Sequence, residues 1–272
     1  MLAPLMLAEL SGRRALVTGA SGGLGPVIAR ALHGRGAYVV LSGRRADALE
    51  ALREDLGERV EVEVADLADR SEVERMAGLS RNVDVLVANA ALPASGLLED
   101  FTAEQIDRAL DVNLRAPIQM ARVAAPEMVA RGAGALVFVS SMSGKVSSAG
   151  QSLYSGTKFG LRGFAFALHE ELRGTGVAVS TIFPGFVRGA GMFADTGLDA
   201  PRGTGTSSPE QVAEAVLRGI ETGRAEIDVA PLNVRLGVRA GMAAPLVAAA
   251  VSRRLGAADV AAEIAARQRE KR

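Results

Sequence analysis

Short apolar segments recur along the chain, separated by longer stretches in which apolar and polar residues mix. Seven of them are candidate strands, the last being the weakest: residues 15–18, 38–41, 60–64, 83–87, 135–139, 177–183 and 225–230. Most are continuously apolar, as is typical of strands covered on both faces of a sheet. Residues 60–64 alternate between Val and Glu, which predicts a strand with one exposed face.

Helical patterns lie between these segments. The first helix is predicted by an apolar stripe at positions i, i+3, i+4, i+7 and i+8, formed by Leu24, Val27, Ile28, Ala31 and Leu32. Capping boxes at 71–74, 102–105 and 208–211 predict three further helix starts. We expect residues 102–131 to form one long helix, bent or interrupted near Pro117, and residues 152–173 to form another.

The alternation of strands and helices predicts the architecture. It indicates right-handed βαβ units and an α/β fold: a Rossmann-like, doubly wound parallel sheet of about seven strands with helices on both faces. No linker divides the chain, so residues 1–230 are expected to be one domain and residues 231–272 a helical C-terminal extension of it. Residues 186–207 predict a long loop of the kind that often covers a substrate.

Composition excludes several kinds of site. The 272-residue chain has no Cys, which rules out disulfides, thiol catalysis and thiolate-bound metals, and its two His, His33 and His169, leave no metal site expected. Its 31 basic and 31 acidic residues give no electrostatic reason to expect nucleic-acid binding. Residues 1–10 lack the pattern of a secretion signal and run 242–251 is too short to span a bilayer, so a cytoplasmic protein is expected.

A glycine-rich segment follows the first predicted strand and opens the first predicted helix. Thr18 is followed by Gly19, Gly23 and Gly25, in a strand–loop–helix context. Such a loop lets the backbone and a helix N-terminus approach a pyrophosphate, whereas the simpler alternative is a tight turn without a ligand. We therefore predict dinucleotide binding.

The end of the second predicted strand bears on the choice of dinucleotide. An acid there would favour NAD(H), but the chain continues Ser42-Gly43-Arg44-Arg45. A guanidinium pairs well with a 2′-phosphate, so NADP(H) is favoured over NAD(H), with Arg44 ahead of Arg45. The alternative is that both arginines only solvate a loop. The 1–230 unit is then predicted to be an NADP-binding, Rossmann-type catalytic domain.

Tyr154 and Lys158 stand four residues apart on a predicted helix, in a chain with only two Tyr and three Lys. They share a helix face, and a nearby ammonium would lower the pKa of the phenol, so that Tyr154 could act as a general acid or base. A surface pair without function is the alternative.

These segments together resemble the short-chain dehydrogenase/reductase family, in its shorter, single-domain form. Thr18–Gly25 matches the loop T-G-x-x-x-G-x-G, and Tyr154 with Lys158 matches the motif Y-x-x-x-K. The other matches, in chain order, are Asp66, Asn113, Ser141 and Pro184-Gly185.

The resemblance implies roles for individual residues. Asn113, Ser141, Tyr154 and Lys158 would be catalytic: Tyr154 would exchange a proton with the substrate oxygen, Ser141 would hold that oxygen, Lys158 would hold the ribose and lower the pKa of Tyr154, and Asn113 would bind a water near Lys158. The cofactor-binding set would be Gly19, Ser21, Gly23, Leu24, Gly25, Arg44, Asp66, Leu67, Asn89, Tyr154, Lys158, Pro184, Gly185 and Val187. Family likeness also implies a homodimer or homotetramer.

The chain departs from the family pattern at three places. Ala88-Asn89-Ala90-Ala91 stands where N-N-A-G is usual, and Gly189 replaces a Thr expected near the nicotinamide. Gly22 occupies a position that is basic in some NADP-preferring members, which leaves the preference for NADP(H) dependent on Arg44.

The function that this resemblance implies is an NADP(H)-dependent interconversion of a carbonyl and an alcohol on a small, apolar substrate. Alternatives are a 3-oxoacyl thioester reductase, a non-catalytic dinucleotide-binding regulator and, less favoured, a methyltransferase. Ser141, Tyr154 and Lys158 are superfluous to the last two.

Some further residues have ordinary structural interpretations. Tyr38 is expected in the core and Lys145 in solvent, while Met192, Phe193 and Leu198 are candidates for an apolar substrate pocket. Residues 234–251 are expected to be a helical tail that packs on the domain or on another subunit. A basic amphipathic segment on a membrane is the less favoured alternative.

Overall fold

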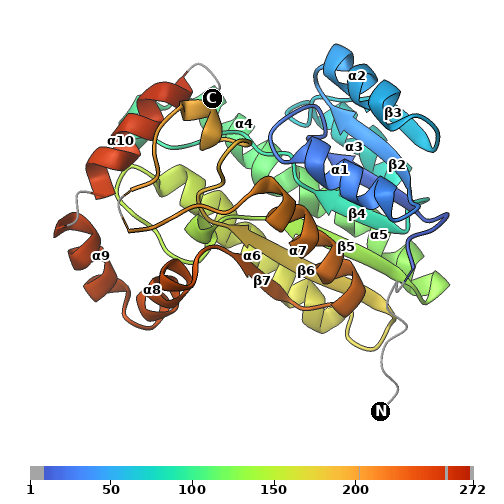
Figure 1. The fold of residues 1–272 in the computed structure, drawn as a ribbon. Coiled ribbons are helices and arrows are strands. Elements are labelled where there is room, and N and C mark those ends of the chain that lie inside the picture. The colour runs from blue at the N-terminus through green and yellow to red at the C-terminus, as the bar shows by residue number, and fades with distance from the viewer. Residues whose placement is uncertain (1–8, 202, 255–256, 270–272) are drawn as a thin grey trace.

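A seven-stranded parallel sheet forms the centre of the protein (Figure 1). The structure, a computed structural model, describes residues 9–201, 203–254 and 257–269. The strands are β1 (Arg14–Thr18), β2 (Tyr38–Gly43), β3 (Val60–Val64), β4 (Val85–Ala88), β5 (Gly134–Val139), β6 (Val177–Pro184) and β7 (Glu226–Val229). Their order, β3-β2-β1-β4-β5-β6-β7, reverses between β1 and β4 and confirms the predicted doubly wound architecture.

Helices cover both faces of this sheet. They are α1 (Gly25–Gly34), α2 (Ala46–Leu56), α3 (Arg70–Ser80), α4 (Ala103–Leu110), α5 (Ala116–Arg131), α6 (Ser152–Glu171), α7 (Pro209–Thr222), α8 (Leu232–Ala243), α9 (Pro245–Arg254) and α10 (Ala257–Gln268), with short helical turns η1 (Leu98–Asp100), η2 (Asp111–Arg115), η3 (Met142–Gly144) and η4 (Ala194–Thr196). Side chains of α1, α2 and α7 fill one apolar layer, and those of α3, α5 and α6 fill the other.

The helix starts agree in part with the predictions. Thr102 and Ser208 each form a complete capping box. The expected box at 71–74 is wrong: the cap of α3 lies two residues earlier, because the Asp69 carboxylate accepts the Ser71 N–H at 2.8 Å and caps the helix itself.

The long helix expected over residues 102–131 is interrupted. Between α4 and α5 the backbone widens into the π-helical turn η2, and Pro117 follows in the first turn of α5. A π turn re-aims side chains relative to a continuous α-helix. Here the turn carries Asn113, which it buries.

Two single-residue predictions are wrong. Tyr38 is 36% exposed rather than in the core, because it begins β2 at the rim of the sheet, where the Arg14 guanidinium lies 5.6 Å from its ring centre. Lys145 is buried, with 7% of its surface exposed, because two carboxylates from β7 surround its ammonium group.

The C-terminal extension folds as three helices beyond the carboxyl edge of the sheet (Figure 1). Val238 of α8 packs against Met142 and Phe183, and the Gln268 amide of α10 donates a 2.9 Å hydrogen bond to the Met192 carbonyl in the long loop. The tail expected over residues 234–251 therefore packs on the domain through α8. No residue of α9 is buried within the described chain, so a contact of α9 with another subunit stays a prediction. Within the described ranges, no helix is long and apolar enough to cross a membrane.

Candidate active site

The predicted site residues gather at the carboxyl edge of the sheet. Thr18, Ala88, Val139 and Pro184 end four neighbouring strands, β1, β4, β5 and β6. Because the strand order reverses between β1 and β4, the loops that leave these two strands diverge and open a crevice, which is where doubly wound sheets bind ligands.

The glycine-rich loop is packed too closely to admit side chains. Gly19 has a φ of +69°, and a Cβ there would lie 2.8 Å from the Ala90 Cα; a Cβ on Gly25 would lie 2.7 Å from the Ala20 Cα. Helix α1 then starts without a side-chain cap and without an acidic residue in its first turn. Its N–H groups are therefore open to an anion, and the loop fits a dinucleotide pyrophosphate.

The segment after β4 holds this loop in place. The Thr18 hydroxyl accepts hydrogen bonds from the backbone N–H groups of Asn89 and Ala90, both at 3.1 Å, and the Asn89 side chain donates to the Thr18 carbonyl at 3.0 Å. Asn89 therefore shapes the loop even though its neighbours, Ala88 and Ala91, depart from the family pattern. Of the other loop residues, Ser21 packs against Gly43 of β2, and Leu24 immediately precedes α1.

The two arginines after β2 behave differently. Arg45 folds back over the loop, where its guanidinium donates a hydrogen bond to the Ser21 carbonyl and occupies the space that a side chain on Gly22 would need. Arg44 is exposed and makes no hydrogen bond or ion pair with the described part of the chain. The sequence singled out Arg44, whereas the structure places Arg45 nearer the phosphate loop and leaves Arg44 free to bind.

Asp66 and Leu67 follow β3 at the same edge. The Asp66 carboxylate accepts the Ala68 N–H at 3.0 Å, with the Arg108 guanidinium 3.9 Å away. The Leu67 side chain is buried in the core, so only its backbone is available to a cofactor.

Three serines follow the end of β5, and the structure separates them by their hydrogen-bond partners. The Ser141 hydroxyl accepts the Ser143 N–H at 3.1 Å and makes a side-chain hydrogen bond with Tyr154. Ser140 points the other way, into the protein, where it donates to the Lys158 carbonyl at 3.2 Å, and Ser143 donates to the Gln151 side chain at 3.0 Å. Ser141 is the serine that the fold brings to Tyr154.

Tyr154 and Lys158 project from the first turns of α6. The Lys158 ammonium lies 5.7 Å from the centre of the Tyr154 ring and donates a 3.1 Å hydrogen bond to the Val139 carbonyl. Burial lowers the pKa of Lys158 to about 8. Burial also raises the pKa of Tyr154, and the hydrogen bond from Ser141 only opposes this rise. The expected lowering of the Tyr154 pKa is therefore wrong for this structure, because desolvation of the phenolate dominates.

Asn113 is tied to the segment that follows β4. Its side-chain oxygen accepts the Leu92 N–H at 2.6 Å, and its amide donates to the Leu92 carbonyl at 2.9 Å. The amide is also 3.5 Å from the Thr157 hydroxyl, next to Lys158 in the chain. Asn113 thus joins α6 to the crevice through backbone contacts, and it makes no direct hydrogen bond to Lys158 within the described residues.

Pro184, Gly185 and Val187 lead from β6 into the long loop. The Gly185 N–H donates to the Val229 carbonyl at 2.9 Å, and Val187 is buried and pairs with Ser207 across the loop base. Farther along, the rings of Phe186 and Phe193 contact each other in a tilted arrangement, with their centres 4.6 Å apart. The loop is therefore closed on itself and carries apolar side chains.

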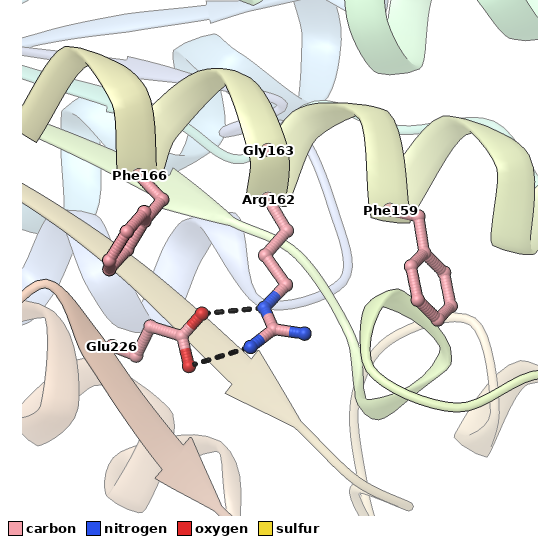
Figure 2. Close-up of a pocket in the computed structure, with 5 residues that line it drawn as sticks. All are labelled: Phe159, Arg162, Gly163, Phe166 and Glu226. Carbon is pink, nitrogen blue, oxygen red and sulfur yellow. Dashed lines mark hydrogen bonds and ion pairs between the residues drawn. The ribbon is translucent and has the colours of Figure 1, made fainter. Parts of the chain in front are cut away.

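Sequence reasoning missed a charged cluster behind the site. The Lys145 ammonium lies 2.6 Å from Asp228 and 2.9 Å from Glu226, and Glu226 also accepts a hydrogen bond from Arg162 of α6. Figure 2 shows this two-point Arg162–Glu226 contact in a shallow pocket of about 290 Å³ between Phe159 and Phe166. The signal was present: Glu226 and Asp228 alternate along β7, so both point to one face of the sheet.

The two histidines engage backbone carbonyls. His33 contacts the Glu58 carbonyl and His169 the Val179 carbonyl, both at 2.9 Å. In the part of the chain that the structure describes, no group of three or more His, Cys, Asp or Glu side chains is arranged to hold a metal ion.

Residues 13–200 match the sequence profile of the short chain dehydrogenases. The chain belongs to the short-chain dehydrogenase family. It is therefore an oxidoreductase of the dehydrogenase/reductase type, and the family match covers the glycine-rich loop, Ser141, Tyr154 and Lys158.

Individual members of this short-chain dehydrogenase family are similar over most of the chain. Nodulation protein G of Rhizobium meliloti (strain 1021) is 38% identical over 186 residues, which cover 67% of this chain and 76% of that protein. The ketoacyl reductase HetN of Nostoc sp. is 34% identical over 231 residues, covering 82% and 80%. A solved short-chain dehydrogenase from Sphingobium yanoikuyae in complex with NADPH superposes with a TM-score of 0.73 at 28% identity, covering 85% of this chain and 94% of that chain.

Proposed function

We propose that the protein is an NADP(H)-dependent oxidoreductase that interconverts a carbonyl and an alcohol on a small, apolar substrate. The observation that carries this proposal is the convergence of Ser141, Tyr154 and Lys158 beside the glycine-rich loop. A structural hydroxyl–phenol pair would not require a buried ammonium group at its side.

The chain's own groups suit proton transfer to a carbonyl oxygen. Tyr154, with its raised pKa, stays protonated at neutral pH and can donate its O–H proton, while the Ser141 hydroxyl hydrogen-bonds the same substrate oxygen. The Lys158 ammonium stabilises the tyrosinate that results. Asn113 positions the α6 turn that carries both groups. In the reverse direction the same atoms accept the proton of an alcohol.

NADP(H) would be held by the loop at Gly19–Gly25 and by the arginines after β2, and when bound it supplies or accepts the hydride. The absence of an acid at the end of β2 and the presence of Arg44 and Arg45 support NADP(H) over NAD(H). The solved Sphingobium relative in complex with NADPH supports the same choice. The roles assigned to Asp66, Leu67, Asn89 and Pro184 through Val187 belong to this proposal.

The apolar nature of the substrate is inferred from the walls beyond the site. Met192, Phe193 and Leu198 of the long loop are partly buried, and Ile264 and Ala265 of α10 are buried against the same region. Such a surround favours a substrate that brings apolar groups. A cytoplasmic location and a homodimer or homotetramer remain predictions, as does the assignment of residues 1–230 and 231–272 to one domain and its extension.

The test is a panel of carbonyl and alcohol compounds, with oxidation of NADPH and NADH followed by absorbance. We expect turnover with NADPH on at least one apolar carbonyl. The Tyr154→Phe variant should bind NADPH as the wild type does and lose turnover at least 100-fold, in line with the roughly 10²–10⁴-fold contribution of a general acid. NADPH binding without any turnover would favour the non-catalytic regulator, and unchanged turnover in Tyr154→Phe would refute the mechanism.

A 3-oxoacyl thioester reductase is a second candidate within the same chemistry. It is favoured by the relative named ketoacyl reductase HetN, which is similar over 82% of this chain. Including 3-oxoacyl thioesters in the panel separates the two candidates, since such an enzyme should prefer the thioester over a simple ketone of equal length.

A further inference from the structure

Helices α8 and α9 present a row of large apolar side chains to solvent. Leu246 is 85% exposed, Leu232 66% and Val247 64%. Three more exposed apolar side chains continue the surface: Leu236, Met242 and Val251. We call these six residues the apolar surface of α8–α9. In α9 none of the ten residues is buried, so packing within the described protein does not account for its apolar sequence.

The same segment is strongly basic. Residues 232–254 contain four arginines and no Asp or Glu, whereas the whole chain balances 31 basic against 31 acidic residues. Arg239, Arg253 and Arg254 are exposed and make no ion pair with any described residue. The positive charge of this segment is therefore uncompensated.

The arginines continue the apolar rows along each helix. Leu232, Leu236 and Arg239 follow one another at i, i+4 and i+7 of α8. On α9, Arg253 and Arg254 lie seven residues after Leu246 and Val247 and so fall on the same face. A long arginine side chain can run along an apolar surface and place its charge at the border with a polar phase. Apolar side chains flanked by arginine are the pattern of a helix that lies in a membrane interface.

The opposite side of α8 fixes this surface to the catalytic domain. Val238 packs on Met142 and Phe183, and a Cβ on Gly241 would lie 3.0 Å from the Val146 side chain. Met142 begins η3 directly after Ser141, and Val146 follows the end of that turn. The apolar surface of α8–α9 is therefore held beside the active-site edge of the sheet, where Figure 1 shows both helices.

We infer that the apolar surface of α8–α9, with Arg239, Arg253 and Arg254, binds to the surface of an anionic lipid bilayer. The helices have 12 and 10 residues, so they would lie in the interface and not cross it. The charge distinguishes this partner from a second copy of the chain, because a two-fold contact through this surface would bring arginines together without any acid to pair with them. Anionic headgroups supply the missing negative charge.

The test is co-sedimentation of the full chain with lipid vesicles. We expect binding to vesicles of phosphatidylcholine with about 30% phosphatidylglycerol, at least tenfold weaker binding to phosphatidylcholine alone, and weakening with salt. A double variant, Leu246→Glu with Val247→Glu, should lose at least tenfold in binding. The matched control is Val64→Glu with Val129→Glu, because these are also two exposed apolar residues but lie on β3 and α5, far from α8–α9 in Figure 1; it should bind as the wild type does.

The arginines are tested separately, so that the result does not depend on one variant. Arg253→Gln with Arg254→Gln should weaken binding to anionic vesicles about tenfold or more, and Arg253→Lys with Arg254→Lys should restore it. Absence of binding by the wild type, or equal binding by both glutamate double variants, would overturn the inference. So would light scattering showing that Leu246→Glu with Val247→Glu dissociates an assembly that binds no vesicles, because the surface would then join copies of the chain.

Discussion

Two lysines of the described chain are buried, and the groups that surround their ammonium groups differ. Lys145 is 7% exposed and lies within ion-pair distance of Asp228 and Glu226. Lys158 is 2% exposed, and its ammonium donates to the Val139 carbonyl with no carboxylate among the described residues within ion-pair distance. Both lie in the same region of the fold, Lys145 shortly after the end of β5 and Lys158 near the start of α6.

The difference fits a structural role for Lys145 and the catalytic role proposed for Lys158. The carboxylates around Lys145 compensate for the hydration that its ammonium group loses on burial. Their pairing also affects Glu226: burial raises the pKa of Glu226, but hydrogen bonds from Arg162 and Lys145 outweigh burial and hold this pKa below its usual range. Lys158 has no such compensation, and burial lowers its pKa to about 8. An uncompensated buried ammonium costs stability, so its place beside Tyr154 supports the proposed role of Lys158 in proton transfer.

Replacing Lys158 should give the largest effect. In Lys158→Met we expect turnover to fall at least about 100-fold, because the tyrosinate loses its neighbouring positive charge. The free energy of unfolding at pH 7 should rise by about 2 kcal/mol, because the cost of burying the ammonium outweighs one lost hydrogen bond. Turnover is measured with NADPH and stability by urea titration. A loss of stability would mean that Lys158, like Lys145, is a structural lysine.

Replacing Lys145 should have the reverse consequence for stability. Lys145→Met leaves Asp228 and Glu226 near one another without the cation, and we expect a loss of about 3–5 kcal/mol in the free energy of unfolding, as for other broken buried ion pairs. The double variant with Asp228→Asn should recover part of this loss, because it removes a carboxylate left without its partner. Urea titration of both variants checks the order, and equal stability of wild type and Lys145→Met would refute the structural role.

The pH dependence of the free energy of unfolding gives a further test of Lys158. The pKa of Lys158 is about 8 in the folded protein and about 10.5 when unfolded. Below pH 8 both states carry the proton and the full cost of burial is present. As pH rises from 8 towards 10.5, the folded state loses its proton first, so stability increases by up to about 3 kcal/mol. The difference between wild type and Lys158→Met in unfolding free energy should shrink over this range.

The two arginines after β2 also differ in whether the described chain binds them. Arg44 is free of partners in the described chain and Arg45 is held on the Ser21 carbonyl. We expect Arg44→Ala to weaken NADPH binding about tenfold and NADH binding little, as for one lost charge-assisted contact. Arg45→Ala should weaken both dinucleotides to a similar, smaller extent, because it loosens the loop. Fluorescence titration with the two dinucleotides measures this, and tighter binding of NADH than NADPH by the wild type would refute the choice of NADP(H).

The regular part of the fold was predictable because local patterns and tertiary packing agree there. Each predicted strand occurs, since short apolar or alternating runs bounded by turn residues favour strands of a covered sheet. The capping boxes at Thr102 and Ser208 were also readable, because both partners are local. Ser71 was misjudged because Asp69, two residues earlier, accepts the Ser71 N–H and caps α3.

The sequence by itself determined the doubly wound sheet and the glycine-rich loop, and it placed Tyr154 and Lys158 on one helix face because they stand four residues apart. Ser141 was a candidate through the resemblance to the family. Tertiary structure decided which charges are compensated. Residues 83 positions apart in the chain, Lys145 and Asp228, meet only when β7 is added to the sheet, and the same packing leaves Lys158 alone. It also decided that no described residue of the chain buries α9, because burial depends on what lies opposite a helix and no local pattern encodes that.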